Sequence, residues 1–155
     1  MTRSGDGPRR RRTGDRVRGQ RGAATIELAL VVPALMLVLG LLIAGGRLWY
    51  ARTVVAEAGY AAARAGSLAR TAAEARIAAG SAGRQSLATA RLDCEQVRVK
   101  VSTAAFRVPA GRPATVTATI RCSVPLTDVV LPGLPGRIEL DGTGAAALDT
   151  YRGRG

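Results

Sequence analysis

One acidic side chain lies at the start of a long apolar run, where a charge is costly. Glu27 follows residues 23–26 (Ala-Ala-Thr-Ile) and precedes the uncharged segment 28–46. A carboxylate inside a bilayer costs on the order of 2.5–3.5 kcal/mol at mid-depth and less near the interface. Two interpretations follow. Glu27 either faces head groups and pairs with nearby arginines, or it requires a partner inside the membrane or in an assembly of such helices.

Few other residues in the chain offer chemistry. There is no His, which removes the usual general base and the commonest metal ligand. Cys94 and Cys122 are the only cysteines, too few for a structural zinc site without other soft ligands. No phosphate-cradling glycine motif is present. The composition therefore predicts a protein that is not an enzyme and that binds no metal or cofactor.

The apolar run that positions Glu27 is predicted to be a membrane-spanning helix. Residues 28–46 are nineteen consecutive residues without a charge. At 1.5 Å per residue they make roughly 28 Å of helix, close to the roughly 30 Å hydrocarbon core of a bilayer. Pro33 lies early in this run and is expected to kink the helix or to loosen its first turn.

The charges on either side of the run predict its orientation. Residues 1–22 contain eight Arg and two Asp, a net charge of +6, whereas Arg47 and Arg52 follow the run sparsely. The positive-inside rule then places the N-terminus in the cytoplasm and the C-terminal part outside, in a single-pass protein of the cell membrane. Trp49 and Tyr50 lie where aromatic side chains would mark the outer surface of the bilayer.

Two other interpretations compete for this region. A secretory signal would be cut after Gly46, with Ala44 and Gly46 at the small-residue positions. Against it, the apolar run exceeds the roughly 7–15 residues usual for such a signal, and Glu27 stands at its start. The basic arm would also suit nucleic acid, but the chain has only five aromatic residues on which bases could stack, so nucleic-acid binding is not expected.

The residues between the basic arm and the apolar helix read Gly22-Ala23-Ala24-Thr25-Ile26-Glu27. This arrangement resembles the processing site of type IV pilin-like proteins. The resemblance implies that a membrane prepilin peptidase cuts between Gly22 and Ala23 and removes the leader. It also implies that Glu27, the fifth residue of the mature chain, meets the new amino terminus of a neighbouring subunit during assembly.

A wider set of residues narrows the resemblance. These residues are Arg21-Gly22, Glu27-Leu28-Ala29-Leu30-Val31-Val32-Pro33, Gly46-Arg47, Tyr50-Ala51-Arg52 and Ala61-Ala62-Ala63-Arg64-Ala65. Together they resemble the TadE-like family of the tight-adherence system, whose members are minor pilins or pseudopilins of Flp-type pili. The resemblance implies other pilin subunits and the pilus assembly platform as partners. Two departures leave the subfamily open: Leu28 takes the place of a frequent Phe, and Ala44-Gly45 lacks an acid often found before Gly-Arg.

The segment after the apolar run is Ala-rich and predicts a second stretch of helix over 47–79. Small apolar residues recur along it at three- and four-residue steps, as on one helix face: Leu48, Val55, Ala58, Ala62, Ala65, Ala69 and Ala72. The helix would pack on a sheet of its own domain or on other subunits. Residues 80–83 (Gly-Ser-Ala-Gly) are expected to end it.

Alternating residues predict three strands in the last third of the chain. Val97, Val99 and Val101 alternate with polar residues, as do the apolar residues of 116–124, with Pro and Gly between the two runs. A hairpin is the simplest arrangement. A third alternation over 138–148 suggests one last strand, broken near Gly142. Three strands with a long helix make an α+β fold.

Cys94 and Cys122 flank this hairpin, and a location outside the cytoplasm favours a disulfide between them. Placing both apolar rows on one face pairs Val97 with Ile120, Val99 with Ala118 and Val101 with Val116. Cys94 then falls opposite Ser123, on the face away from Cys122. A bridge therefore requires a bulge near Cys94 or a strand that begins after it. Two reduced thiols are the alternative.

The predicted organisation is a cleaved basic leader (1–22), a transmembrane and assembly helix (23–46), a helical region outside the membrane (47–92) and a small β-rich domain (93–155). The predicted function is that of a TadE-like minor pilin or pseudopilin processed by a prepilin peptidase. The alternative is a generic single-pass envelope protein whose outer domain binds a partner.

Overall fold

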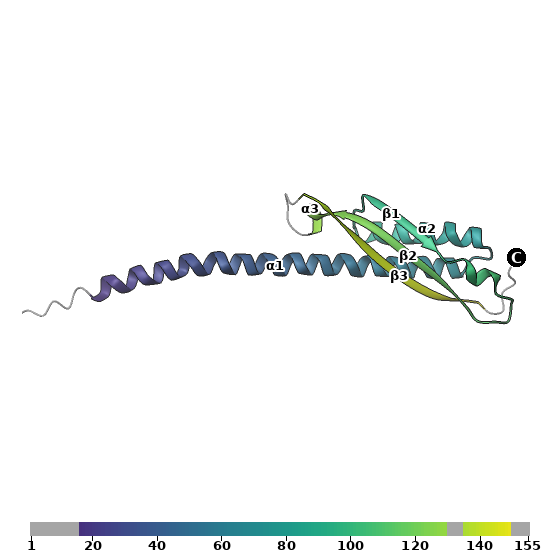
Figure 1. Ribbon diagram of the computed structural model, residues 1–155, viewed down its shortest axis with the longest axis horizontal. Helices are drawn as coiled ribbons and strands as arrows, with labels where there is room; N and C mark the ends of the chain where they lie inside the picture. The colour runs from purple at the N-terminus through teal and green to yellow at the C-terminus, as the bar shows by residue number, and fades with distance from the viewer. Residues whose placement is uncertain (1–15, 130–134, 150–155) are drawn as a thin grey trace, which may run out of the picture. The chain divides into compact units, whose positions relative to one another are not determined.

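The computed structural model describes residues 16–129 and 135–149, with side chains over 27–127 and 135–149. The chain divides into two compact units, Met1–Leu41 and Leu42–Gly155. Its elements in chain order, labelled in Figure 1, are α1 (Arg16–Ser67), α2 (Ala72–Thr89), β1 (Gln96–Val101), the 3-10 helix η1 (Ala104–Arg107), β2 (Ala114–Pro125), α3 (Leu126–Val129) and β3 (Arg137–Leu148). This is the predicted α+β fold.

The described part of the first unit is apolar helix that nothing within the unit covers. Helix α1 continues through Pro33 without interruption. Between Leu28 and Leu41 the large apolar side chains are 43–71% exposed. Among the described residues, Glu27–Ser67 is the one helix long and apolar enough to cross a membrane. A soluble helix does not expose apolar side chains on every side, so lipid or other apolar helices must cover this one.

The second unit, residues 42–155, is called the helix–sheet unit below. Its core lies between the C-terminal part of α1 and one face of the three-stranded sheet. Helix α1 contributes small, fully buried residues at helical spacing, and β2 contributes the larger ones. The α1 residues of this apolar core are Ala51, Val54, Val55, Ala58, Ala62 and Ala63, and the buried residues of β2 include Val116, Ala118, Ile120, Cys122 and Val124. The predicted apolar face of α1 is thus confirmed as far as Ala62, whereas Ala65, Ala69 and Ala72 are only half-buried.

The sheet is antiparallel with strand order β1-β2-β3. The predicted hairpin and the buried faces of its strands are confirmed, but the predicted register is wrong by two residues. Val97 pairs with Cys122, Val99 with Ile120 and Val101 with Ala118. A shift of two keeps every side chain on its own face, so alternation cannot distinguish the two registers.

The predicted end of the helical region at residues 80–83 is also wrong. Helix α1 ends earlier, at Ser67, and Gly80 and Gly83 lie buried inside α2. A Cβ added at Gly83 would lie 2.6 Å from the Cδ1 atom of Ile120, so this glycine gives the Ile120 side chain its space. Close packing against the sheet, rather than a chain reversal, explains the glycine.

Helix α2 begins at a cap that the sequence displays as Thr71-Ala-Ala-Glu74. The Thr71 hydroxyl accepts a hydrogen bond from the Glu74 backbone N–H at 3.2 Å, and the Glu74 carboxylate accepts one from the Arg70 N–H at 3.2 Å. The first contact satisfies a donor that the first turn of a helix leaves free. The second differs from a capping box in that Glu74 accepts from the residue before the N-cap.

Replacing Thr71 by Ala is expected to lower the free energy of unfolding by about 1 kcal/mol, because the Glu74 N–H loses its acceptor. Urea denaturation of the full chain in detergent, followed by circular dichroism, measures the change. Thr89→Ala is the matched control, since the Thr89 hydroxyl only donates to the Gln85 carbonyl within α2. Equal losses for the two variants would show that the Thr71 cap contributes nothing specific.

Strand β3 is continuous over twelve residues, so the predicted break near Gly142 is wrong. Gly142 pairs with Ile120, and Gly144 pairs with Ala118. Both glycines lie directly against the α1 backbone. A Cβ at Gly142 would collide with the Val55 carbonyl, and one at Gly144 would collide with the Gly59 backbone. Figure 1 shows β2 and β3 crossing over this part of α1. The two glycines let the helix and the strand backbones touch.

Candidate processing segment and membrane-proximal site

The predicted processing residues Gly22 and Ala23 lie in the backbone of α1, in the same helix as Glu27. The Glu27 side chain is exposed and makes no ion pair within the described residues. The next residues along the helix, Leu28 and Leu30, are 62% and 71% exposed. The Glu27 carboxylate therefore stands beside apolar side chains that themselves require cover. In such surroundings a carboxylate gains from pairing with a cation.

Cys94 and Cys122 are joined by a disulfide, with their Cα atoms 5.4 Å apart. Strand β1 begins at Gln96, after Cys94, and the Glu95 N–H donates to the Ser123 carbonyl at 2.8 Å. Because Cys94 precedes the ladder, its side chain turns to the buried face where Cys122 lies. No bulge is required. The bridge ties the segment between α2 and β1 to the central strand.

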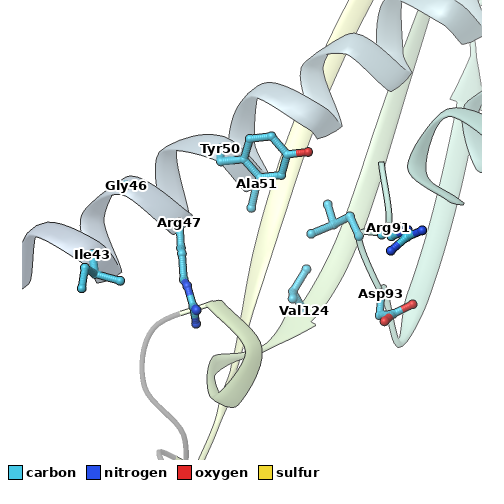
Figure 2. A pocket seen from close by; sticks show the side chains of 9 residues that line it. Ile43, Gly46, Arg47, Tyr50, Ala51, Arg91, Asp93 and Val124 are labelled. Carbon is cyan, nitrogen blue, oxygen red and sulfur yellow. The ribbon is translucent and has the colours of Figure 1, made fainter. Parts of the chain in front are cut away.

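A hollow of about 510 Å³ opens in the helix–sheet unit where the apolar run ends. Ile43, Gly46, Arg47, Tyr50 and Ala51 of α1 line one side, and Arg91, Leu92, Asp93 and Val124 line the other. In Figure 2, Arg47 extends from α1, and Arg91 and Asp93 lie on the opposite side of the hollow. Val124 lies between Arg47 and these two residues. Sequence patterns do not predict this site, because Arg91 and Asp93 are distant from Arg47 in the chain.

Arg91 occupies a backbone conformation that usually belongs to glycine. Its φ is +53°, the one positive value among the described non-glycine residues. It follows the C-cap of α2, where the Arg91 N–H donates to the Ala88 carbonyl at 3.0 Å and the Leu92 N–H to the Leu87 carbonyl at 3.1 Å. This is the Schellman pattern, in which glycine at this position avoids a cost of about 1 kcal/mol. A non-glycine residue in this strained conformation often belongs to a functional site, so the Arg91 side chain is a candidate for a binding role.

The charged groups around the hollow form no ion pair with any other residue that the structure describes. Among the described residues, ion pairs join Arg121 to Asp141 and Arg137 to Glu95, and neither involves Arg47, Arg91 or Asp93. Two guanidinium groups and one carboxylate leave a net charge of +1 above an apolar floor. The described residues contain no group of three or more His, Cys, Asp or Glu side chains suited to a metal ion.

Comparison with protein families connects the long helix to a known class. The family model described as TadE-like protein matches residues 22–64. This segment is therefore similar to TadE-like proteins. The match begins at Gly22, contains Glu27 and the whole apolar run, and ends within the part of α1 that packs on the sheet. It covers less than a third of the chain. No curated protein and no solved structure matches the chain.

The TadE-like segment and the candidate span together support a membrane protein related to the tight-adherence system. Residues 65–155 lie outside the family match, and they include α2 and the whole sheet. The disulfide, the whole second wall of the hollow, and Gly142 and Gly144 therefore belong to the part of the chain that the family match does not describe.

Proposed function

We propose that the chain is a minor pilin or pseudopilin of a Flp-type pilus assembly system. In this proposal a prepilin peptidase cuts between Gly22 and Ala23, while the N-terminus lies in the cytoplasm and the helix–sheet unit lies outside. The observation that carries it is the exposed apolar helix whose TadE-like match begins at Gly22. A helix that is apolar on every side can be covered by lipid before assembly and by the helices of other subunits afterwards.

Glu27 has a specific role in this proposal. Cleavage before Ala23 creates an ammonium group four residues ahead of the carboxylate, in a region that becomes apolar once helices pack together. A buried carboxylate is stabilised by a paired cation, and the new amino terminus of a neighbouring subunit provides one.

Intact-mass analysis of the chain, expressed with and without a cognate prepilin peptidase, tests the processing step. We expect a peptidase-dependent loss of residues 1–22 and a complete block by Gly22→Leu. Gly19→Leu, the same change three residues earlier in the leader, is the matched control and should be cut normally. An uncut wild-type chain would instead support a generic single-pass envelope protein. A cut after Gly46 would show that the apolar run is a secretory signal.

Glu27→Gln separates assembly from processing in the same experiment. The variant should be cut like the wild type, because the substitution leaves Gly22 and Ala23 unchanged. It should be lost from sheared pilus fractions, because an amide does not neutralise a neighbouring ammonium group. Glu57→Gln, which removes an exposed carboxylate further along α1, is the control and should remain in those fractions. Equal incorporation of both variants would contradict the role proposed for Glu27.

A further inference from the structure

We infer that the hollow lined by Arg47 and Arg91 binds the head group of an anionic phospholipid, whose phosphate pairs with a guanidinium group of its wall. This inference goes beyond the proposed function, since it concerns the unassembled chain in the membrane and does not depend on cleavage. It rests on three properties of the hollow: its depth along the helix, its unpaired charge and its apolar floor.

The depth follows from the apolar run. Residues 28–46 span roughly 28 Å as a helix, which matches the roughly 30 Å core of a bilayer. Ile43 and Gly46 close this run, and Arg47 is the first charged residue after it. All three line the hollow. In a chain whose apolar run spans the bilayer, Arg47 then lies at the level of the phosphate groups of that leaflet.

The charge selects the lipid. Arg47, Arg91 and Asp93 give a net charge of +1, and none of them has an ion-pair partner in the described part of the chain. A guanidinium presents a planar fork of donors that matches phosphate oxygens. A phospholipid of net charge −1, such as phosphatidylglycerol, complements this set. Its glycerol hydroxyls can also donate hydrogen bonds to the Asp93 carboxylate.

The apolar floor distinguishes the hollow from a site for a free anion. Ile43, Ala51, Leu92 and Val124 contribute aliphatic surface, and Val124 is buried. Such surface accommodates the glycerol backbone and the first methylene groups of a lipid rather than a hydrated ion. The conformation of Arg91 adds to this argument, because the position tolerates glycine best and yet carries an arginine that lines the hollow.

The test uses the full, uncut chain in nanodiscs of phosphatidylcholine with a minor fraction of phosphatidylglycerol. Native mass spectrometry counts the lipids that stay bound after release from the disc. We expect the wild type to retain phosphatidylglycerol in preference to phosphatidylcholine. Arg47→Gln and Arg91→Gly should each lower that retention about fivefold, corresponding to about 1 kcal/mol per basic residue.

Two features of the variants separate a site from general surface charge and from misfolding. Arg52 is exposed, lies five residues beyond Arg47 and does not line the hollow. The Arg52→Gln variant should therefore retain as much phosphatidylglycerol as the wild type. Arg91→Gly suits the positive φ, so its unfolding temperature should be unchanged or raised.

Several results would overturn the inference. One is an equal loss of bound phosphatidylglycerol in Arg52→Gln and Arg47→Gln, which would show that general surface charge alone retains the lipid. Another is equal retention of the two lipids by the wild type. A third is a stable dimer in the discs whose crosslinks run through Leu92 or Val124, because a second copy would then occupy the hollow. Uncut chain that retains phosphatidylglycerol would support the site even if the peptidase never cleaves Gly22.

Discussion

Gly142→Val is expected to prevent stable packing of α1 on the sheet. A side chain at Gly142 would collide with the Val55 carbonyl and lie 2.7 Å from the Ala56 backbone nitrogen. These are backbone atoms of a helix, which cannot turn aside as the end of a flexible side chain can. Separation of α1 from β3 would expose Val55 and Ile120, both fully buried. We expect a loss of about 3 kcal/mol or more in the free energy of unfolding, from overpacking and lost burial.

Urea denaturation of the full chain in detergent, followed by the sheet signal in circular dichroism, measures this loss. A small domain has about 5–15 kcal/mol of stability, so such a loss can leave the unit largely unfolded at moderate denaturant. Gly144→Val should behave similarly, since its side chain would meet the backbone of Gly59 and Tyr60.

Gly80→Ala provides the matched control for this prediction. A Cβ at Gly80 would meet only the mobile end of the Arg84 side chain, at 3.4 Å or more. Alanine also favours the helix by about 0.5–1 kcal/mol relative to glycine. Gly80→Ala should therefore match or exceed the stability of the wild type. If Gly142→Val unfolds at the same urea concentration as Gly80→Ala, the α1 and β3 backbones do not approach each other closely at Gly142.

Removal of the Cys94–Cys122 bridge is expected to cost about 3–4 kcal/mol. The bridge closes a loop with a sequence separation of 28, and its loss releases that segment in the unfolded state. Cys94→Ala with Cys122→Ala avoids leaving a new polar group in the core, where Cys122 is fully buried. The urea midpoint of this double variant should equal that of wild-type protein treated with a reductant.

The oxidation state of Cys94 and Cys122 tests whether the helix–sheet unit lies outside the cytoplasm. Protein purified from the cell envelope under alkylating conditions should contain no free thiol, because disulfides persist outside the cytoplasm. Two alkylated cysteines in otherwise folded protein would contradict both the bridge and the location of the helix–sheet unit. An unchanged urea midpoint on reduction would show that the bridge adds no stability.

The sequence by itself determined the features that depend on local patterning. Nineteen uncharged residues require an apolar helix, whatever follows them. Alternation around Val99 and Ile120 assigned strands and buried faces correctly, because side chains alternate strictly across a strand. The position of Glu27 after Gly22 indicated the family, and the family match agrees. The capping signal at Thr71 was also present in the sequence, but the alanine-rich composition around it suggested an uninterrupted helix.

Only the tertiary structure decided the features that depend on contacts between distant segments. A shift of two residues between β1 and β2 preserves both faces, so the register required the whole ladder. Gly83 and Gly142 resemble chain breakers in sequence, yet each lies inside a regular element where Ile120 or the α1 backbone takes the space of a side chain. Arg47 and Arg91 meet at one hollow because α2 returns the chain to the start of the helix–sheet unit. Sequence patterns indicate on which face of a helix or strand a residue lies. Whether another element approaches that residue closely depends on which segment the fold places opposite it.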